Sequence, residues 1–142
     1  MPKRSADAQW EGNLPKGHGT IRFDAWQGAY SFASRFEDGQ GTNPEELIAA
    51  AHAGCFSMAF SAMLSDAGHT PNKVHTTATV YIEKVEGGFG ITRIHLNCEG
   101  DVPGIDDANF QDIANQAKAG CPVSRALAAV PEITLEATLI QQ

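Results

Sequence analysis

The sequence predicts an α+β fold, because strand-like and helix-like patterns occupy separate blocks of the chain. Alternating apolar residues mark strands near the start, in the middle and at the end. A long apolar segment with helix caps lies between the first two blocks, and two shorter helical patterns precede the last. With 142 residues, 42% of them hydrophobic, the chain is expected to form a single domain over residues 1–142.

Residues 5–36 alternate in the manner of three short strands. Residues 13–17, Asn-Leu-Pro-Lys-Gly, predict the first turn, and the segment 26–28 is expected to supply the second. On this prediction Arg35 ends a strand shortly before the central helix begins.

Residues 43–68 are predicted to form one long helix. Asn43 suits the N-cap, Pro44 suits the first helical position, and Glu46 follows the cap at capping-box spacing. Gly68 is a C-terminal stop signal. The caps and the polar residues argue against a membrane span.

The second half of the chain begins with a hairpin over residues 74–98, which turns at 86–88. A helix is predicted over 106–120, and a shorter one follows over 121–129 with proline at its first position. Residues 133–139 make a final strand. The sequence shows no internal repeat or linker.

The net charge of −7 disfavours nucleic acid as a partner, since phosphate backbones are bound by clustered Lys and Arg. The basic residues near the N-terminus are not followed by an apolar run, so no secretory signal is predicted. We expect a cytoplasmic protein.

The cysteines are Cys55, Cys98 and Cys121, which form neither a C-x-x-C pair nor a zinc ligand pattern. An odd number of cysteines in a reducing compartment argues against a structural disulfide, so any disulfide would be transient. Cys98 alternates inward with its strand neighbours and is expected in the core.

Cys55 lies in mid-helix, where a free cysteine is more often a small packing residue than a nucleophile. The helix dipole fades within the first turn, so it cannot lower the pKa of this thiol. A thiolate at Cys55 therefore needs a cation from elsewhere, and Arg35 and Arg125 are the arginines nearest to the cysteine-bearing segments.

Cys121 directly precedes Pro122 at a helix N-cap, where backbone N–H groups favour a thiolate. Cap positions normally hold Ser, Thr, Asp or Asn, so a cysteine there suggests function as well as packing. Cys55 and Cys121 suit a nucleophile and a resolving thiol that meet in space.

His52 precedes Cys55 by three residues and projects from roughly the same helical face. It suggests a Cys/His nucleophile pair or a metal ligand, although no ligand cluster and no oxyanion-hole motif support either, and it could simply pack. The other histidines are expected at the surface: His18, His69, His75 and His95.

Glu45 lies ten residues before Cys55, about 15 Å along a continuous helix. A favourable charge in the first helical turn is sufficient to explain it. A role beside Cys55 would require a second subunit.

Four segments resemble a known family: Thr-Asn-Pro-Glu-Glu-Leu at 42–47, Ala-Ala-His-Ala-Gly-Cys-Phe-Ser-Met-Ala at 50–59, Val-Pro-Gly-Ile-Asp at 102–106 and Lys-Ala-Gly-Cys-Pro-Val-Ser at 118–124. They resemble the OsmC/Ohr family of thiol-dependent peroxidases, and its OsmC branch more than its Ohr branch. The similarity extends from Trp10 to the last strand.

This resemblance implies an intertwined homodimer in which antiparallel sheets wrap around the long central helices, with two active sites at the subunit interface. It implies a peroxidatic Cys55 and a resolving Cys121. Arg35 and Glu45 match the family's arginine and glutamate. No metal, haem or flavin is expected.

The implied reaction reduces organic hydroperoxides, and more weakly hydrogen peroxide, to alcohols through a cysteine sulfenic acid and an intramolecular disulfide, in oxidative or osmotic stress defence. Phe56, Met58 and Phe60 are expected to form apolar walls for the substrate. The reductant would be a dithiol, such as a lipoylated or thioredoxin-like protein. The alternatives are a non-catalytic stress or ligand-binding protein with packing cysteines, and a Cys/His hydrolase.

Overall fold

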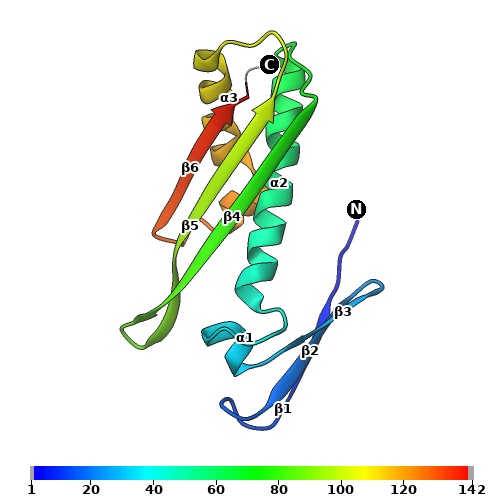
Figure 1. Cartoon of the computed structure of the whole chain (residues 1–142), viewed down its shortest axis with the longest axis vertical. Coiled ribbons are helices and arrows are strands. Elements are labelled where there is room, and N and C mark those ends of the chain that lie inside the picture. The colour runs from blue at the N-terminus through cyan, green and yellow to red at the C-terminus, as the bar shows by residue number, and fades with distance from the viewer. Residues whose placement is uncertain (1, 141–142) are drawn as a thin grey trace. The chain divides into compact units, whose positions relative to one another are not determined.

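A computed structural model describes residues 2–140 and has the predicted α+β architecture (Figure 1). The chain forms two compact units, residues 1–47 and 48–142. Each unit contains one three-stranded sheet, and the long helix α2 (Pro44–Asp66) starts in the first unit and continues into the second.

The first unit holds an antiparallel meander of β1 (Asp7–Glu11), β2 (His18–Phe23) and β3 (Trp26–Tyr30). The predicted turn at 13–17 is confirmed by a hydrogen bond from Gly17 N to Asn13 O of 2.8 Å. The second turn was placed wrongly, because Trp26 already pairs with Phe23. Asp24 makes this turn with a φ of 49°, a conformation that aspartate tolerates better than most residues.

The prediction that Arg35 ends a strand is also wrong, since Arg35 lies in the short helix α1 (Phe32–Phe36). The hydroxyl of Ser31 accepts a hydrogen bond from Ser34 N (3.1 Å), and the hydroxyl of Ser34 accepts one from Ser31 N (2.8 Å). This reciprocal cap satisfies two backbone donors at once, which favours a helix over a continued strand.

Both predicted ends of α2 are confirmed. The side-chain oxygen of Asn43 accepts a hydrogen bond of 2.8 Å from Glu46 N at the start of the helix. Gly68, with a φ of +92°, donates its N–H to Ser65 O at the end. By length and composition alone α2 could cross a membrane, a test that the core helix of a soluble protein also passes.

The second unit contains a sheet in the order β4 (Lys73–Val85), β5 (Gly88–Asp101) and β6 (Glu132–Leu139). Strands β4 and β5 form the predicted antiparallel hairpin, whereas β5 and β6 are parallel. A parallel pair needs a crossover connection, which α3 (Asp107–Gly120) and α4 (Pro122–Ala126) supply. Helix α4 is shorter than predicted.

The core of this unit lies between the sheet and helices α2 and α3. Each element contributes a set of buried side chains: Phe56, Phe60 and Leu64 from α2, Ile94, Leu96 and Cys98 from β5, and Phe110, Ala114 and Ala117 from α3. The rings of Phe60 and Phe110 meet edge to face with centroids 5.1 Å apart. Phe56 and Phe60 have no exposed surface, so the expectation that they line a substrate site is wrong.

Another face of α2 is exposed in the single chain and consists of small or apolar residues: Ala51, Gly54, Met58, Ala62 and Ser65. Among the described residues, Met58 is the most exposed large apolar residue, at 77%. A contiguous apolar helix face is typical of a surface that binds another chain.

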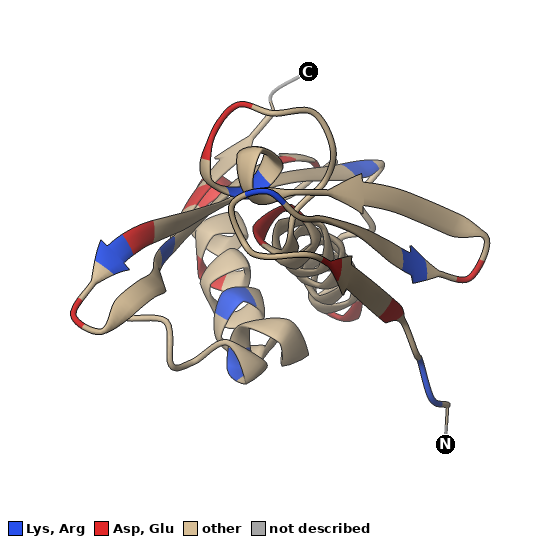
Figure 2. Cartoon of the chain, turned by 90° about the horizontal axis from the view of Figure 1, so that it is seen from below, with Lys and Arg blue, Asp and Glu red and all other residues tan. Residues whose placement is uncertain are grey.

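On the described residues, the charges do not form a basic patch of the kind that binds nucleic acid. Figure 2 shows Lys and Arg on separate elements and interspersed with Asp and Glu. Two of the few basic residues are neutralised locally, since Arg22 contacts Asp7 at 3.1 Å and Arg35 contacts Glu45 at 2.9 Å.

We predict opposite effects of alanine at two glycines. A Cβ at Gly100 of β5 would lie 2.6 Å from Phe110 Cε1, whereas a Cβ at Gly54 of α2 meets no atom within 4 Å. Gly100→Ala should lower the free energy of unfolding by about 1–3 kcal/mol, because the buried Phe110 ring has no room to move. At concentrations where the chain is monomeric, Gly54→Ala should raise the free energy of unfolding by about 0.5–1 kcal/mol through helix propensity, because nothing within one chain contacts its Cβ. Denaturant titration measures both, and similar effects at the two positions would contradict this packing.

Candidate active site

Two thiols from distant parts of the chain meet inside the second unit. The sulfur of Cys55, in the middle of α2, lies 2.9 Å from the sulfur of Cys121, at the junction of α3 and α4. The two residues are 66 positions apart in sequence, and both are free thiols. The expectation that Cys55 and Cys121 meet in space agrees with this contact.

The backbone around Cys121 explains how its sulfur reaches α2. Its N–H closes the last turn of α3 on Ala117 O (2.8 Å), and its carbonyl accepts the first hydrogen bond of α4 from Arg125 N (3.0 Å). Pro122 cannot continue α3 and occupies the first position of α4. Cys121 is therefore both the C-cap of one helix and the N-cap of the next.

The surroundings shift the pKa values of the two thiols in opposite directions. Burial, and then the hydrogen bond and charge shared with Cys121, raise the pKa of Cys55, despite the backbone N–H of Val123. Burial also acts to raise the pKa of Cys121, but the bond to Cys55, the N–H and hydroxyl of Ser124, and the N–H of Val123 together lower it. The second unit thus favours negative charge on Cys121.

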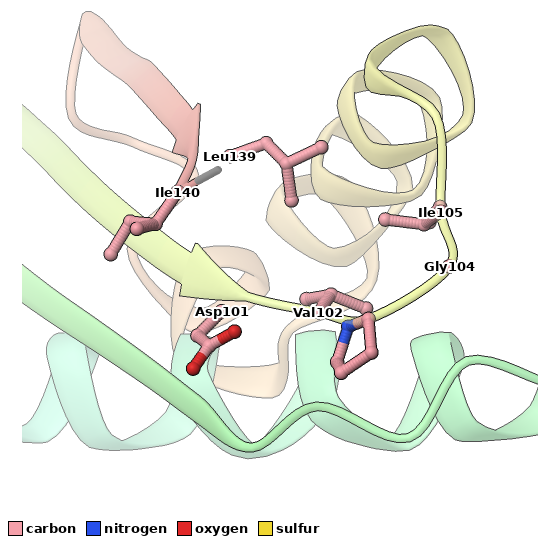
Figure 3. Close-up of a pocket in the computed structure, with 7 residues that line it drawn as sticks. Asp101, Val102, Gly104, Ile105, Leu139 and Ile140 are labelled. Atoms are coloured by element: carbon pink, nitrogen blue, oxygen red, sulfur yellow. The ribbon is translucent and has the colours of Figure 1, made fainter. Parts of the chain in front are cut away.

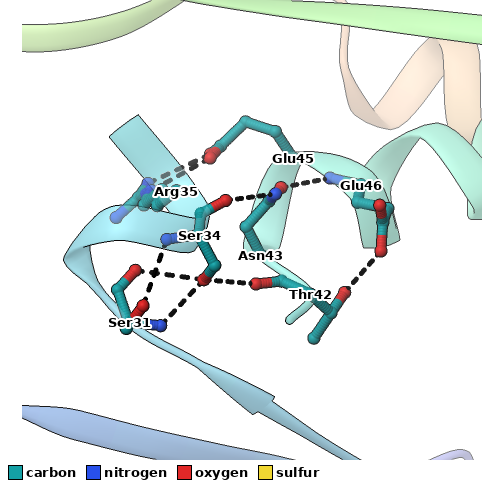
Figure 4. Close-up of polar contacts among 7 residues, drawn as sticks. All are labelled: Ser31, Ser34, Arg35, Thr42, Asn43, Glu45 and Glu46. Atoms are coloured by element: carbon teal, nitrogen blue, oxygen red, sulfur yellow. Dashed lines mark hydrogen bonds and ion pairs between the residues drawn. The ribbon is translucent and has the colours of Figure 1, made fainter. Parts of the chain in front are cut away.

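Arg35 and Glu45 form a two-pronged ion pair in the first unit. Arg35 Nε donates to Glu45 Oε1 at 2.9 Å, and Nη2 donates to Oε2 at 3.0 Å (Figure 4). The side chain of Glu45 is only 8% exposed and that of Arg35 is 35% exposed. This planar geometry fixes the guanidinium and leaves the N–H groups of Nη1 outside the pair.

The ion pair is held by a polar network that joins α1 to the start of α2 (Figure 4). The hydroxyl of Ser34 donates to Thr42 O at 2.7 Å, and Asn43 Nδ2 donates to Ser34 O at 2.9 Å. The hydroxyl of Thr42 donates to the carboxylate of Glu46 at 2.8 Å. These bonds position the helix that carries Arg35 against the turn that carries Glu45.

His52 contacts a serine and is not hydrogen-bonded to Cys55. Its Nε2 lies 2.7 Å from the hydroxyl oxygen of Ser124, and the imidazole has no exposed surface. Burial lowers the pKa of His52, which keeps the ring neutral at neutral pH. Its Nδ1 has no hydrogen-bond partner among the described residues. Ser124 was missed as a site residue, although it stands three positions after Cys121 at the third position of α4.

The remaining candidates are less suited to chemistry. Cys98 is fully buried in the core, as expected, and burial raises the pKa of its thiol. Arg125 is exposed and lines a surface cavity of about 340 Å³ that Ser124 and Lys118 also border. Among the described residues, no group of three or more His, Cys, Asp or Glu side chains is arranged to hold a metal ion.

A separate cavity of about 260 Å³ lies between the end of β5 and the end of β6 (Figure 3). The described residues that line it are Asp101, Val102, Pro103, Gly104, Ile105, Leu139 and Ile140. Asp101 is the ionisable side chain among them, and none of them carries a thiol or hydroxyl.

Comparisons with known proteins identify the family of the chain. The family described as OsmC-like protein matches residues 37–136. Peroxiredoxin OsmC of Escherichia coli K12 is 52% identical over 136 residues, which cover 94% of each chain. An organic hydroperoxide resistance protein of Xanthomonas axonopodis pv. citri is 39% identical over 98 residues, 68% of this chain and 67% of the relative.

Solved structures share the fold. The crystal structure of an OsmC-like protein from Mycoplasma pneumoniae superposes with a TM-score of 0.76 at 21% identity, covering 99% of both chains. That of the organic hydroperoxide resistance protein OhrB of Bacillus subtilis has a TM-score of 0.66 at 24% identity, covering 96% of this chain and 98% of the other. The chain belongs to the OsmC-like protein family and lies closer to its OsmC branch than to its Ohr branch.

Proposed function

We propose that this protein is a cysteine-based peroxidase that reduces organic hydroperoxides to alcohols. The observation that carries the proposal is the 2.9 Å contact between Cys55 and Cys121, two free thiols brought together from α2 and the α3–α4 junction. The relatives named peroxiredoxin OsmC and organic hydroperoxide resistance protein support the same class of reaction.

The first step is attack by the Cys55 thiolate on the distal oxygen of the hydroperoxide. The O–O bond breaks, the alkoxide takes a proton and leaves as the alcohol, and the sulfur of Cys55 is oxidised to a sulfenic acid. Cys121 then attacks this sulfur, the S–O bond breaks, and the hydroxyl takes a proton and leaves as water. The product is a Cys55–Cys121 disulfide, which a dithiol reductant returns to two thiols by exchange.

The first step needs a cation at Cys55, because the contacts of this thiol within the second unit raise its pKa. Arg35 is suited to that role, since Glu45 occupies Nε and Nη2 and fixes the guanidinium while Nη1 can face a thiolate or a peroxide. Glu45 and Cys55 stand ten residues apart on α2, about 15 Å along the axis. We therefore assign the pair Arg35–Glu45 to the Cys55 site of a second copy of the chain.

The exposed face of α2 supports a homodimer. It presents Met58 and several small residues over four turns of helix, and a second copy would cover the apolar surface that one chain leaves in water. The active sites would then lie at the subunit interface. We place this dimer in the cytoplasm, with a dithiol protein of the lipoylated or thioredoxin-like kind as reductant.

The two alternative functions have less support. Cysteines that only pack would not need a contact of 2.9 Å between two sulfurs together with the converging donors around Cys121. A Cys/His hydrolase requires a base at Cys55, but the Nε2 of His52 is bonded to Ser124.

We predict distinct roles for the three cysteines. Cys55→Ser should abolish peroxide consumption, because the attacking sulfur is gone. Cys121→Ser should allow one oxidation per chain and then stall or over-oxidise, because only disulfide formation is lost. Cys98→Ser should retain activity. Peroxide consumption and mass spectrometry of the oxidised thiols measure this, and an active Cys55→Ser protein would refute the assignment.

We predict a preference for alkyl over hydrogen peroxide. Met58 follows Cys55 by three residues on α2 and is exposed, so it can contact an alkyl group bound at the thiol. Burial of each CH₂ contributes about 0.8 kcal/mol, so two buried groups should raise kcat/KM about tenfold. Stopped-flow oxidation by cumene hydroperoxide and by hydrogen peroxide measures the ratio. Equal rate constants would contradict the substrate preference but not the peroxidase chemistry.

We also predict complementation between two inactive proteins. Cys55→Ser and Arg35→Ala homodimers should each be inactive. In their heterodimer, one of the two sites would combine wild-type Cys55 with wild-type Arg35, so a mixture refolded at equal amounts should recover about a quarter of wild-type activity, since half of the dimers are mixed. Native mass spectrometry counts the heterodimers. Proven heterodimers without activity would place both residues of one site on the same chain.

A further inference from the structure

A line of polar groups inside the second unit leads to Cys121 from a residue that the peroxidase steps do not use. His52 is fully buried on α2, and its Nε2 lies 2.7 Å from the hydroxyl oxygen of Ser124. Ser124 stands at the third position of α4, and Cys121 is the N-cap of the same helix. The sulfur of Cys55 follows at 2.9 Å from Cys121.

The unpartnered Nδ1 of His52 indicates where the ring proton lies. A buried N–H without an acceptor is rarer in proteins than a buried acceptor without a donor, so the proton of the neutral ring belongs on Nε2. Nε2–H then donates to the oxygen of Ser124, and the hydroxyl proton of Ser124 is free to point elsewhere. In a capping box the side chain at the third helical position reaches back toward the N-cap, and in α4 these positions are Ser124 and Cys121. The hydrogen bond from the Ser124 hydroxyl to the Cys121 sulfur is the step that the proposal adds.

We propose that His52 is a positioning residue that acts through Ser124 to stabilise the thiolate of Cys121. His52 fixes the hydroxyl of Ser124 so that this hydroxyl donates to the sulfur. The inference rests on the proposed peroxidase function, in which the Cys121 thiolate attacks the sulfenic acid of Cys55. A donor aimed at an ionised sulfur forms a stronger bond than one aimed at a thiol, so it lowers the free energy of the charged form.

The surrounding charges agree with this role. Burial acts to raise the pKa of Cys121, yet the bond to Cys55 and the donors of Ser124 and Val123 lower it. Burial lowers the pKa of His52, so the ring remains a neutral donor. The titratable group that acts directly on Cys121 is Cys55, and in the proposal His52 acts on it through Ser124.

A Ser–His hydrolytic dyad is the competing use of the same contact. Ser124 is only 7% exposed, and the Nδ1 of His52 contacts no carboxylate among the described residues. A serine nucleophile needs access to substrate, and its histidine needs an orienting acid. The contact therefore fits a donor chain to Cys121 better than a second catalytic centre.

The test uses a Cys55→Ser, Cys98→Ala background, which leaves Cys121 as the single thiol and keeps a hydroxyl at position 55. Thiolate absorbance in the ultraviolet reports the pKa of Cys121 without any peroxide. His52→Met removes the donor at similar volume, and we expect the pKa to rise by about one unit, which is about tenfold less thiolate at neutral pH. Ser124→Ala should give a similar rise. His52→Gln, which can place an N–H near the position of Nε2, should restore most of the lowered pKa.

A kinetic measurement in the protein with all three cysteines separates the two chemical steps. After one equivalent of cumene hydroperoxide, His52→Met should oxidise Cys55 at least as fast as the wild type and form the disulfide about tenfold more slowly near neutral pH. Raising the pH should remove this difference in the rate of disulfide formation, because Cys121 is then ionised in both proteins. The double variant His52→Met, Ser124→Ala should be no slower than either single variant, as expected for residues that act in series.

An unchanged Cys121 pKa in His52→Met would overturn the proposal, as would an equal pKa rise in His52→Met and His52→Gln or additive effects of His52 and Ser124. The thiolate titration remains decisive if the wild-type protein consumes no peroxide. In that case the peroxidase function fails, while the positioning of Ser124 by His52 is still tested.

Discussion

The 2.9 Å contact between Cys55 and Cys121 constrains the packing of three helices at once. Helix α2 must pass directly beside the point where α3 ends and α4 begins. Gly120 lies at this approach: an added Cβ would be 3.3 Å from Met63 Cε, so the end of that side chain would have to shift by a few tenths of an ångström. The change of direction at Cys121–Pro122 then turns the sulfur inward, where a continued α3 would have carried it past.

The groups that stabilise a thiolate at the two sulfurs come from different units. Burial and the bond to Cys121 raise the pKa of Cys55, whereas the bond to Cys55 and the donors around Cys121 lower the pKa of Cys121 despite its burial. The cation that could draw the charge to Cys55 is fixed by Glu45 in the first unit, through two hydrogen bonds to Arg35. In the proposed reaction Cys55 is ionised for the first step and Cys121 for the second, so each sulfur has its own set of donors. This separation suits an ordered reaction, because the sulfur of Cys55 no longer carries a negative charge once it is oxidised.

Local signals in the sequence predicted most of the fold. Asn43 and Gly68 mark the ends of α2 because each forms a cap hydrogen bond to a residue only three positions away in the sequence. Helix α1 was missed because the bonds between Ser31 and Ser34 outweigh an apolar alternation that favours a strand. The role of Ser124 could not be predicted, since its partner His52 lies 72 residues away and only the tertiary fold brings them together.

The burial of His52 is not explained by stability. A neutral hydrogen bond such as that to Ser124 contributes about 1 kcal/mol net, while a buried ring nitrogen without a partner costs about 1–3 kcal/mol. An apolar side chain packed against Phe56 and its neighbours in the core would avoid that cost. By this comparison a residue chosen only for packing at position 52 would be apolar. The imidazole has a physical reason to be there if its N–H fixes the hydroxyl of Ser124 and this hydroxyl donates to the Cys121 sulfur. The stabilised species is then an anion, and a hydrogen bond to an anion is stronger than one to a neutral group.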